Sequence, residues 1–290
     1  MTEIRHGLTA ADRAAMTALR ARLAATPIAI TRASYDRLLE QVPPADAVAY
    51  SDSSVGGVPG VWCAPTSHRV GVAMLYLHGG VFAYGSAHAY RNLVGQIAAR
   101  SGVHAFVAGY RLAPEHAFPA ALDDARAAYR GLTAQFGEGH VALVGDSAGG
   151  GLALSLLRDE PGARCGVLLS PWTDLALTGG SLENKTADDP LLTRAALEAS
   201  ARQYLDDHDP RDPRASPLYG PTGGTPPIQV HVGTAEILLD DSLRLGSHDR
   251  IDVHVWEGMP HVFPSSIGLF EAAGLAHDLI AAFLRAELAV

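Results

Sequence analysis

The chain has 290 residues, of which 48% are hydrophobic and 18% are charged, and its formal net charge is −9. This composition is typical of a globular protein with a large buried sheet. The acidic balance, without a Lys/Arg block, makes nucleic acid and anionic membrane surfaces poor partners. No apolar run reaches transmembrane length and the N-terminus lacks the apolar core of a signal peptide, so we expect a cytoplasmic protein without membrane insertion.

The N-terminal region shows two helical patterns before any predicted strand. Residues 8–25 read as an amphipathic helix in which Thr9 and Asp12 are spaced like a capping box. A second pattern covers residues 35–42 and stops before two prolines. Residues 48–65 then contain short extended pieces broken by glycine and proline, which predict a pair of edge strands.

Strands and helices alternate from residue 72 onward. The runs that predict strands cover residues 72–77, 103–108, 141–145, 166–170, 228–232 and 251–256. The patterns that predict helices include residues 88–100, 119–135 and a closing C-terminal helix. This alternation indicates an α/β fold with a mostly parallel sheet and helices on both of its faces. Cys63 and Cys165 fall in apolar segments, so two buried free thiols are expected rather than a disulfide.

The most informative motif lies at the end of the strand at 141–145. The sequence Gly145-Asp146-Ser147-Ala148-Gly149 follows this strand and leads directly into a helix-forming segment. G-x-S-x-G between strand and helix is a nucleophile elbow, in which glycines avoid collisions at a strained turn. The hydroxyl of Ser147 would stand at a helix N-terminus, where negative charge is favoured. Ser147 is therefore the candidate nucleophile.

One long interval, from Trp172 to about Pro227, interrupts the alternation. It holds polar turns and a single helical pattern around Leu197 and Tyr204. A connection of this length is functional or forms a subdomain. Together with the two N-terminal helices it is predicted to form a small helical cap over the carboxyl edge of the sheet, where ligands bind in open α/β folds.

A serine nucleophile needs a base and an acid that orients the base. His261 lies just beyond the last predicted strand, in a loop stiffened by glycine and proline, and is the candidate base. Glu236 leaves the strand at 228–232 at the same edge and is the favoured acid. Asp240 remains the alternative, although its position favours capping of the next helix.

The oxyanion that forms on a substrate carbonyl needs preset donors, usually backbone N–H groups. His78-Gly79-Gly80-Val81 follows a buried strand, and the glycine pair allows the N–H groups to turn toward the nucleophile. The predicted oxyanion hole therefore consists of the N–H groups of Gly79, Gly80, Val81 and Ala148. Asp146 is expected to brace this loop, and Arg111 is expected to pair with Glu115 below it.

These motifs resemble those of the hormone-sensitive-lipase-like bacterial esterases, which have the α/β-hydrolase fold. The resemblance covers nearly the whole chain and rests on His78-Gly79-Gly80, Tyr84-Gly85-Ser86, Tyr110-Arg111-Leu112-Ala113-Pro114-Glu115, the elbow, Ser216-Pro217-Leu218 and Gly258-Met259-Pro260-His261. It implies hydrolysis of short- and medium-chain carboxylic esters under a helical cap, without a cofactor, by Ser147, His261 and Glu236. Within the family, the chain looks most similar to the branch with acetyl-ester and monoterpene-lactone hydrolases.

The chain departs from the family pattern at three places. Val81 stands where a third oxyanion glycine is expected, and Glu236 stands where aspartate is more frequent. The segment from Asp240 to Arg250 is shorter than the resemblance implies, which indicates a truncated helix behind the acid loop.

The expected organisation is a pair of N-terminal cap helices (1–45), a core (46–172), a cap insertion (173–212) and the rest of the core (213–290). The expected activity is ester hydrolysis on a small-molecule substrate, with no metal and no cofactor. Hydrolysis of a lactone or of an N-acetyl or other amide is the alternative reaction, and a non-catalytic small-molecule receptor is the alternative class. The sequence leaves a homodimer open.

Overall fold

The computed structural model describes residues 2–25, 30–221, 223–246 and 250–289. Its strands are β1 (Thr2–His6), β2 (Val48–Val55), β3 (Val58–Pro65), β4 (Ala73–Leu77), β5 (His104–Ala108), β6 (Val141–Asp146), β7 (Ala163–Leu169), β8 (Ile228–Gly233) and β9 (Ile251–Trp256). Its helices are α1 (Ala10–Ala25), α2 (Arg32–Leu39), α3 (Ala87–Ser101), α4 (Ala120–Phe136), α5 (Ser147–Asp159), α6 (Ser181–Asn184), α7 (Arg194–Leu205), α8 (Leu239–Leu245) and α9 (Glu271–Glu287). No helix within these ranges has both the length and the apolar character needed to cross a bilayer.

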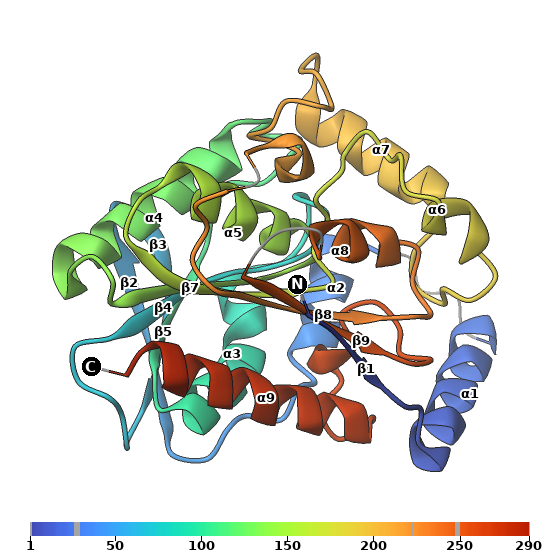
Figure 1. The fold of residues 1–290 in the computed structure, drawn as a ribbon, viewed down its shortest axis with the longest axis horizontal. Coiled ribbons are helices and arrows are strands. Elements are labelled where there is room, and N and C mark those ends of the chain that lie inside the picture. Colours follow the sequence, from blue (N-terminus) through green and yellow to red (C-terminus); the bar gives the residue numbers. More distant parts are fainter. Residues whose placement is uncertain (1, 26–29, 222, 247–249, 290) are drawn as a thin grey trace.

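The nine strands form one sheet in the order β1-β9-β8-β7-β6-β4-β5-β3-β2. All neighbours are parallel except β2 with β3 and β3 with β5, which are antiparallel. Figure 1 shows helices on both faces of this sheet, with α4 and α5 on one side and α3 and α9 on the other. The α/β-hydrolase architecture expected from the sequence is therefore confirmed.

The core has two layers because the central strands are buried on both faces. Successive residues of a strand point to opposite faces. Leu75 and Leu143 accordingly pack in the cluster that includes α4 and α5, whereas Met74 and Val144 pack in the cluster that includes α3 and α9. Cys63 and Cys165 are buried free thiols, as expected.

The first strand was not predicted. Residues 2–6 form β1, which pairs in parallel with β9 at one edge of the sheet, from Thr2 opposite Asp252 to His6 opposite Trp256. The expectation that the N-terminal segment holds only helices is therefore wrong. Ile4 is the only apolar residue of this strand, so no hydrophobic run marks it; its partner β9 supplies the ladder.

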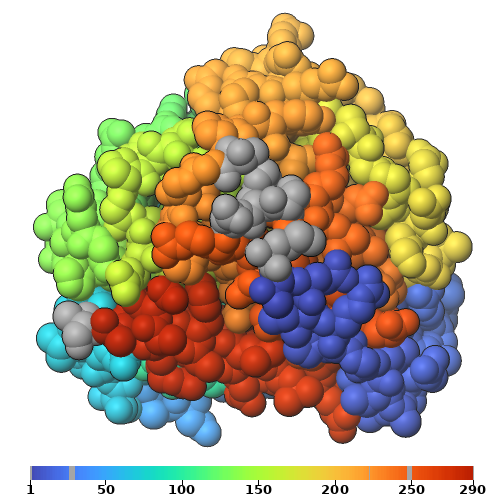
Figure 2. Space-filling model, viewed as in Figure 1, coloured from blue at the N-terminus to red at the C-terminus, as the bar shows by residue number. Residues whose placement is uncertain are grey.

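The N-terminal segment also contacts the C-terminal helix. The carboxylate of Asp12 in α1 accepts the backbone N–H of Glu271 at the start of α9 (2.7 Å), and Thr9 donates to the Glu271 side chain (3.1 Å). Figure 2 shows the blue N-terminal segment beside the red α9 on one face of the molecule. The two ends of the chain therefore close the same side of the fold.

Candidate active site

The strand-to-helix turn after β6 has the strained geometry expected of an elbow. Ser147 is the first residue of α5 and has φ 50°, a left-handed conformation that is costly for a residue with a side chain. A Cβ at Gly149 would overlap the carbonyl oxygens of Leu77 and His78, and a Cβ at Gly145 would overlap that of Gly149. Only glycine fits both positions without moving backbone.

The three residues predicted to act together lie in one hydrogen-bonded row. The Ser147 Oγ is 2.9 Å from His261 Nε2, and His261 Nδ1 is 3.3 Å from Glu236 Oε1. Glu236 is fully buried, and the His261 side chain is 9% exposed. The residues follow β6, β9 and β8 respectively, so the carboxyl ends of parallel strands bring them to one edge of the sheet.

Asp240 lies elsewhere. Its carboxylate accepts the backbone N–H of Ser181 at the first residue of α6 (2.9 Å), and no hydrogen bond or ion pair joins it to His261 in the described part of the chain. The expectation that it caps its own helix is also wrong, because α8 begins after Leu238 without a side-chain cap. Asp240 instead ties α8 to the start of α6. The truncated helix expected here, α8, has seven residues, and residues 247–249 lie outside the described residues.

A serine that the sequence analysis missed connects the acid to the histidine loop. The Ser170 hydroxyl donates to Glu236 Oε2 (2.8 Å) and accepts the backbone N–H of Val262 (3.0 Å), next to His261. Ser170 follows β7, the strand between those that carry Ser147 and Glu236. The sequence did contain a signal for Ser170, because it is a polar residue directly after a buried strand. That strand lies between the two strands that carry Ser147 and Glu236.

The charges around His261 favour its protonated form. Burial alone would lower the pKa of the imidazole, but the hydrogen bond and charge of Glu236, with the charges of Asp189 and Asp146, outweigh burial and raise that pKa above its ordinary value. Asp189 is held near the acid loop, because its carboxylate accepts the N–H of Ile237 (2.8 Å). The site can therefore stabilise a proton on His261.

The loop after β4 lies directly against the elbow. A Cβ at Gly79 would overlap the Asp146 carboxylate and come within 3.1 Å of the Ser147 Cβ. The N–H of Gly79 donates to Asp146 Oδ1 (2.9 Å), so Asp146 braces this loop as expected. For the same reason Gly79 does not fit the predicted role of an oxyanion donor, because its N–H is already bonded.

Three amide groups at this loop and elbow remain free to donate. Among the described residues, the N–H groups of Gly80 and Val81 meet no protein acceptor. The N–H of Ala148 lies in the first turn of α5, where helical N–H groups lack intrahelical partners. Val81 and Phe82 both have positive φ, 49° and 61°, which shapes the turn that presents these amides.

The ion pair expected below the loop is different in the structure. Arg111 pairs with Asp124 (2.7 Å), whereas Glu115 pairs with Arg32 of α2 (2.6 Å). The prediction of an Arg111–Glu115 pair is therefore wrong. Arg32 lies 83 residues from Glu115 in the sequence, so no local spacing indicated that the two residues pair.

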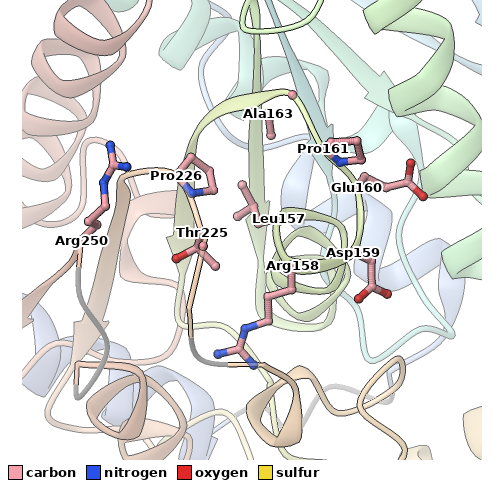
Figure 3. Close-up of a pocket in the computed structure, with 11 residues that line it drawn as sticks. Leu157, Arg158, Asp159, Glu160, Pro161, Ala163, Thr225, Pro226 and Arg250 are labelled. Atoms are coloured by element: carbon pink, nitrogen blue, oxygen red, sulfur yellow. The ribbon is translucent and has the colours of Figure 1, made fainter.

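A cavity of about 350 Å³ lies at the opposite edge of the sheet, where β7, β8 and β9 begin. Figure 3 shows its lining, in which Arg158 and Arg250 point in different directions and Asp159 and Glu160 add negative charge. These charged groups do not converge on one point. This cavity therefore offers no arrangement of charged groups comparable to the row of Ser147, His261 and Glu236.

Comparison with known proteins gives the same architecture. A family profile described as the alpha/beta hydrolase fold matches residues 74–265. An acetyl-hydrolase of Streptomyces hygroscopicus is 39% identical over an alignment 277 residues long, which covers 88% of each chain. An esterase of Acinetobacter venetianus is 40% identical over an alignment 190 residues long, which covers 63% of each chain.

Two solved structures are similar over almost their whole length. The crystal structure of EstE5 soaked with ethyl alcohol has a TM-score of 0.90 and 31% identity, covering 98% of this chain and 100% of that chain. The crystal structure of an esterase from the bacterial hormone-sensitive lipase family has a TM-score of 0.89 and 36% identity, covering 97% and 99%.

A mostly parallel sheet with an elbow serine at its carboxyl edge defines an α/β hydrolase. The chain belongs to the hormone-sensitive-lipase family of that fold, and like the other members it is a carboxylic ester hydrolase.

The elbow predicts the effect of one methyl group. We expect Gly149→Ala to destabilise the fold and abolish esterase activity, because its Cβ cannot avoid the carbonyls of Leu77 and His78. Gly274→Ala is the matched control: Gly274 lies in α9 with nothing within 4 Å of an added Cβ, so the change should stabilise by up to about 1 kcal/mol. Urea denaturation and ester hydrolysis measure both. A Gly149→Ala protein with normal stability and activity would contradict this account.

Proposed function

We propose that this protein is a serine carboxylesterase that hydrolyses short- to medium-chain carboxylic esters through an acyl-enzyme. The proposal rests above all on the row from Ser147 Oγ to His261 to Glu236, with spacings of 2.9 and 3.3 Å. A hydroxyl bonded to an imidazole that is itself bonded to a buried carboxylate is the arrangement that activates serine.

In the first half-reaction, the Ser147 oxygen attacks the ester carbonyl carbon while His261 Nε2 takes the hydroxyl proton. Glu236 orients the imidazole through Nδ1 and stabilises its positive charge. The carbonyl oxygen becomes an oxyanion, which accepts hydrogen bonds from the N–H groups of Gly80, Val81 and Ala148. His261 then returns its proton to the leaving alcohol as the carbon–oxygen bond breaks, and the acyl group remains on Ser147.

In the second half-reaction, a water molecule attacks the acyl carbon and His261 accepts its proton. The second tetrahedral intermediate collapses, the carboxylic acid leaves, and the proton returns to Ser147. No step needs a metal or a cofactor.

We also propose that the N-terminal helices within residues 1–45 and the insertion at 173–212 act as one cap on the core formed by residues 46–172 and 213–290. Support comes from contacts between the two cap segments: Arg20 of α1 donates to the carbonyls of Ala187 and Asp188. Tyr204 of α7 stacks on Phe82, with ring centroids 3.7 Å apart. Phe82 belongs to the loop between β4 and α3, residues 78–86, which we call the oxyanion loop. Strand β1 is the part of the first segment that belongs to the sheet.

A wall of aromatic rings supports the restriction to shorter acyl chains. Phe82, Trp172 and Tyr204 are each at most 1% exposed, and Phe82 also contacts Trp172 at 5.8 Å between ring centroids. The backbone N–H of Trp172 donates to the carbonyl of Ser147 (2.9 Å), which holds these rings next to the proposed nucleophile. We infer that these rings limit the space available to a long acyl chain beside Ser147.

Ser147→Ala tests the nucleophile. The variant should lose ester hydrolysis while keeping its melting temperature, because the hydroxyl bonds only to His261 in the described residues. A fluorophosphonate should label the wild-type protein once per chain, at Ser147, and leave the variant unlabelled. Substantial activity in purified Ser147→Ala would remove the nucleophile assignment, and an unreactive wild-type protein would favour a receptor.

Glu236→Gln and Asp240→Asn test the acid. We expect Glu236→Gln to lower kcat by on the order of 10³–10⁴, as loss of the orienting carboxylate does in serine proteases, and Asp240→Asn to leave kcat nearly unchanged. The wild-type kcat/KM should fall as the pH falls through the raised pKa of His261, because only the neutral imidazole accepts a proton. Glu236→Gln removes the main group that raises this pKa, so its residual activity should persist to lower pH. The opposite ranking of the two variants would exchange their roles.

A series of p-nitrophenyl esters tests the acyl limit. We expect kcat/KM to be at least about tenfold higher for the acetate and butyrate than for the decanoate, a discrimination within reach of a packed pocket. Tyr204→Leu should reduce this difference, because it shortens one side of the aromatic wall. A preference of the wild-type protein for the decanoate, or much faster hydrolysis of lactones measured alongside, would contradict the proposed substrate class.

A further inference from the structure

Helix α2 contacts the oxyanion loop mainly through polar side chains. None of its residues is fully buried, and only Tyr35 and Leu39 pack partly against the core. Hydrophobic burial therefore contributes little to its position. Its hydrogen bonds, by contrast, concentrate on residues 83–90 and 113–115. The helix is therefore joined to the loop that follows β4 more than to the sheet.

Arg32 is the centre of these contacts. Its Nε donates to the carbonyl of Ala83 (2.8 Å), and its Nη2 donates to the carbonyl of Ala113 (2.9 Å). Its two Nη atoms also donate to the two oxygens of Glu115, at 2.9 and 2.6 Å. A planar guanidinium can make these bonds at once because its donors form a rigid fork.

The two carbonyls that Arg32 binds flank the strained turn. The N–H of Ala113 donates to the carbonyl of Phe82 (2.9 Å), and the N–H of Ala83 donates to that of Gly80 (2.9 Å). Arg32 therefore connects the two loop segments, at Ala83 and at Ala113, that hold Val81 and Phe82 at positive φ. A β-branched residue keeps such a conformation only where its surroundings impose it.

The same helix supports the other end of the loop. The Tyr35 hydroxyl is 2.9 Å from that of Tyr90, which donates to Asp146 Oδ2 (3.1 Å), and Asp146 in turn accepts the N–H of Gly79. Asp36 accepts the hydroxyl of Ser86, the N-cap of α3 (2.9 Å). One helix thus reaches the loop at Gly79 through a chain of hydrogen bonds and at Ala83 directly.

We propose that α2 braces the oxyanion loop and that Arg32 is a positioning residue for the reaction, acting through the carbonyls of Ala83 and Ala113 to aim the N–H groups of Gly80 and Val81. This inference rests on the proposed function. Displacement of such donors is costly, since misplacement by about 1 Å can lower a rate about 10²-fold.

The exposure of the pair separates this role from a purely structural one. The side chains of Arg32 and Glu115 are 45% and 55% exposed, and ion pairs in such positions contribute little to stability. Loss of Arg32 should therefore affect the rate far more than the melting temperature. It should also act on transition-state stabilisation more than on substrate binding.

The test compares Arg32→Ala with Arg37→Ala in the full-length enzyme. Arg37 lies on the same helix, is exposed and has no bond to any described residue, so its removal changes the charge equally. With p-nitrophenyl acetate, we expect kcat of Arg32→Ala to fall on the order of 10- to 100-fold with KM within about twofold. Affinity for a trifluoromethyl ketone, which forms a tetrahedral oxyanion on the serine, should fall by a similar factor. Arg37→Ala should match the wild type in both.

Glu115→Gln and Ser147→Ala complete the set. Glu115→Gln keeps the bonds of Arg32 to the two carbonyls, so its kcat should fall less than that of Arg32→Ala. Equal rates for Arg32→Ala and Arg37→Ala, or a change confined to KM, would overturn the proposal, as would a kcat loss explained by a lower fraction folded. Ser147→Ala keeps the two conclusions apart: its inactivity supports the proposed function whatever Arg32 does, and its activity would remove that function.

Discussion

The arrangement of the site depends on the hydrogen bonds that the Asp146 carboxylate accepts. Asp146 is buried, lies next to Ser147 in the sequence and accepts three hydrogen bonds, from the N–H of Gly79 and the hydroxyls of Tyr76 and Tyr90. Burial raises the pKa of Asp146 to about 6, against the opposing effect of these hydrogen bonds and of the nearby His261. A single side chain thereby holds the elbow against the loop that carries the free amides, so Ser147 and the N–H groups of Gly80 and Val81 are positioned relative to one another.

The sequence predicted those parts of the site that are encoded locally. The glycines that shape the turn at Ser147, Gly145 and Gly149, lie within two residues of it in the sequence. The glycine and proline before His261 lie within three residues of it. The position of Glu236 beside His261 was predictable because Glu236 leaves a strand at the edge where His261 also lies. The Arg32–Glu115 pair and the link through Ser170 were not, because each depends on a partner that only the folded chain brings close.

The misassignment of Gly79 has the same origin. Sequence shows that a glycine pair can turn its amides toward the serine, but not which amide another acceptor will take. Asp146 takes that of Gly79 and leaves those of Gly80 and Val81. Strand β1 escaped prediction for a related reason: its pairing with β9 is a property of the ladder, and its own side chains are mostly polar.

The pairing of β1 with β9 also constrains how the protein is made. Thr2 lies opposite Asp252, so β1 has no partner until β9 has also been synthesised. Closing a loop of this length costs entropy, although the cost grows only slowly with length. During synthesis the central strands can assemble around β4 and β6 while β1 is still unpaired. The edge of the sheet at β1 is therefore completed late, after residues from both halves of the chain are available.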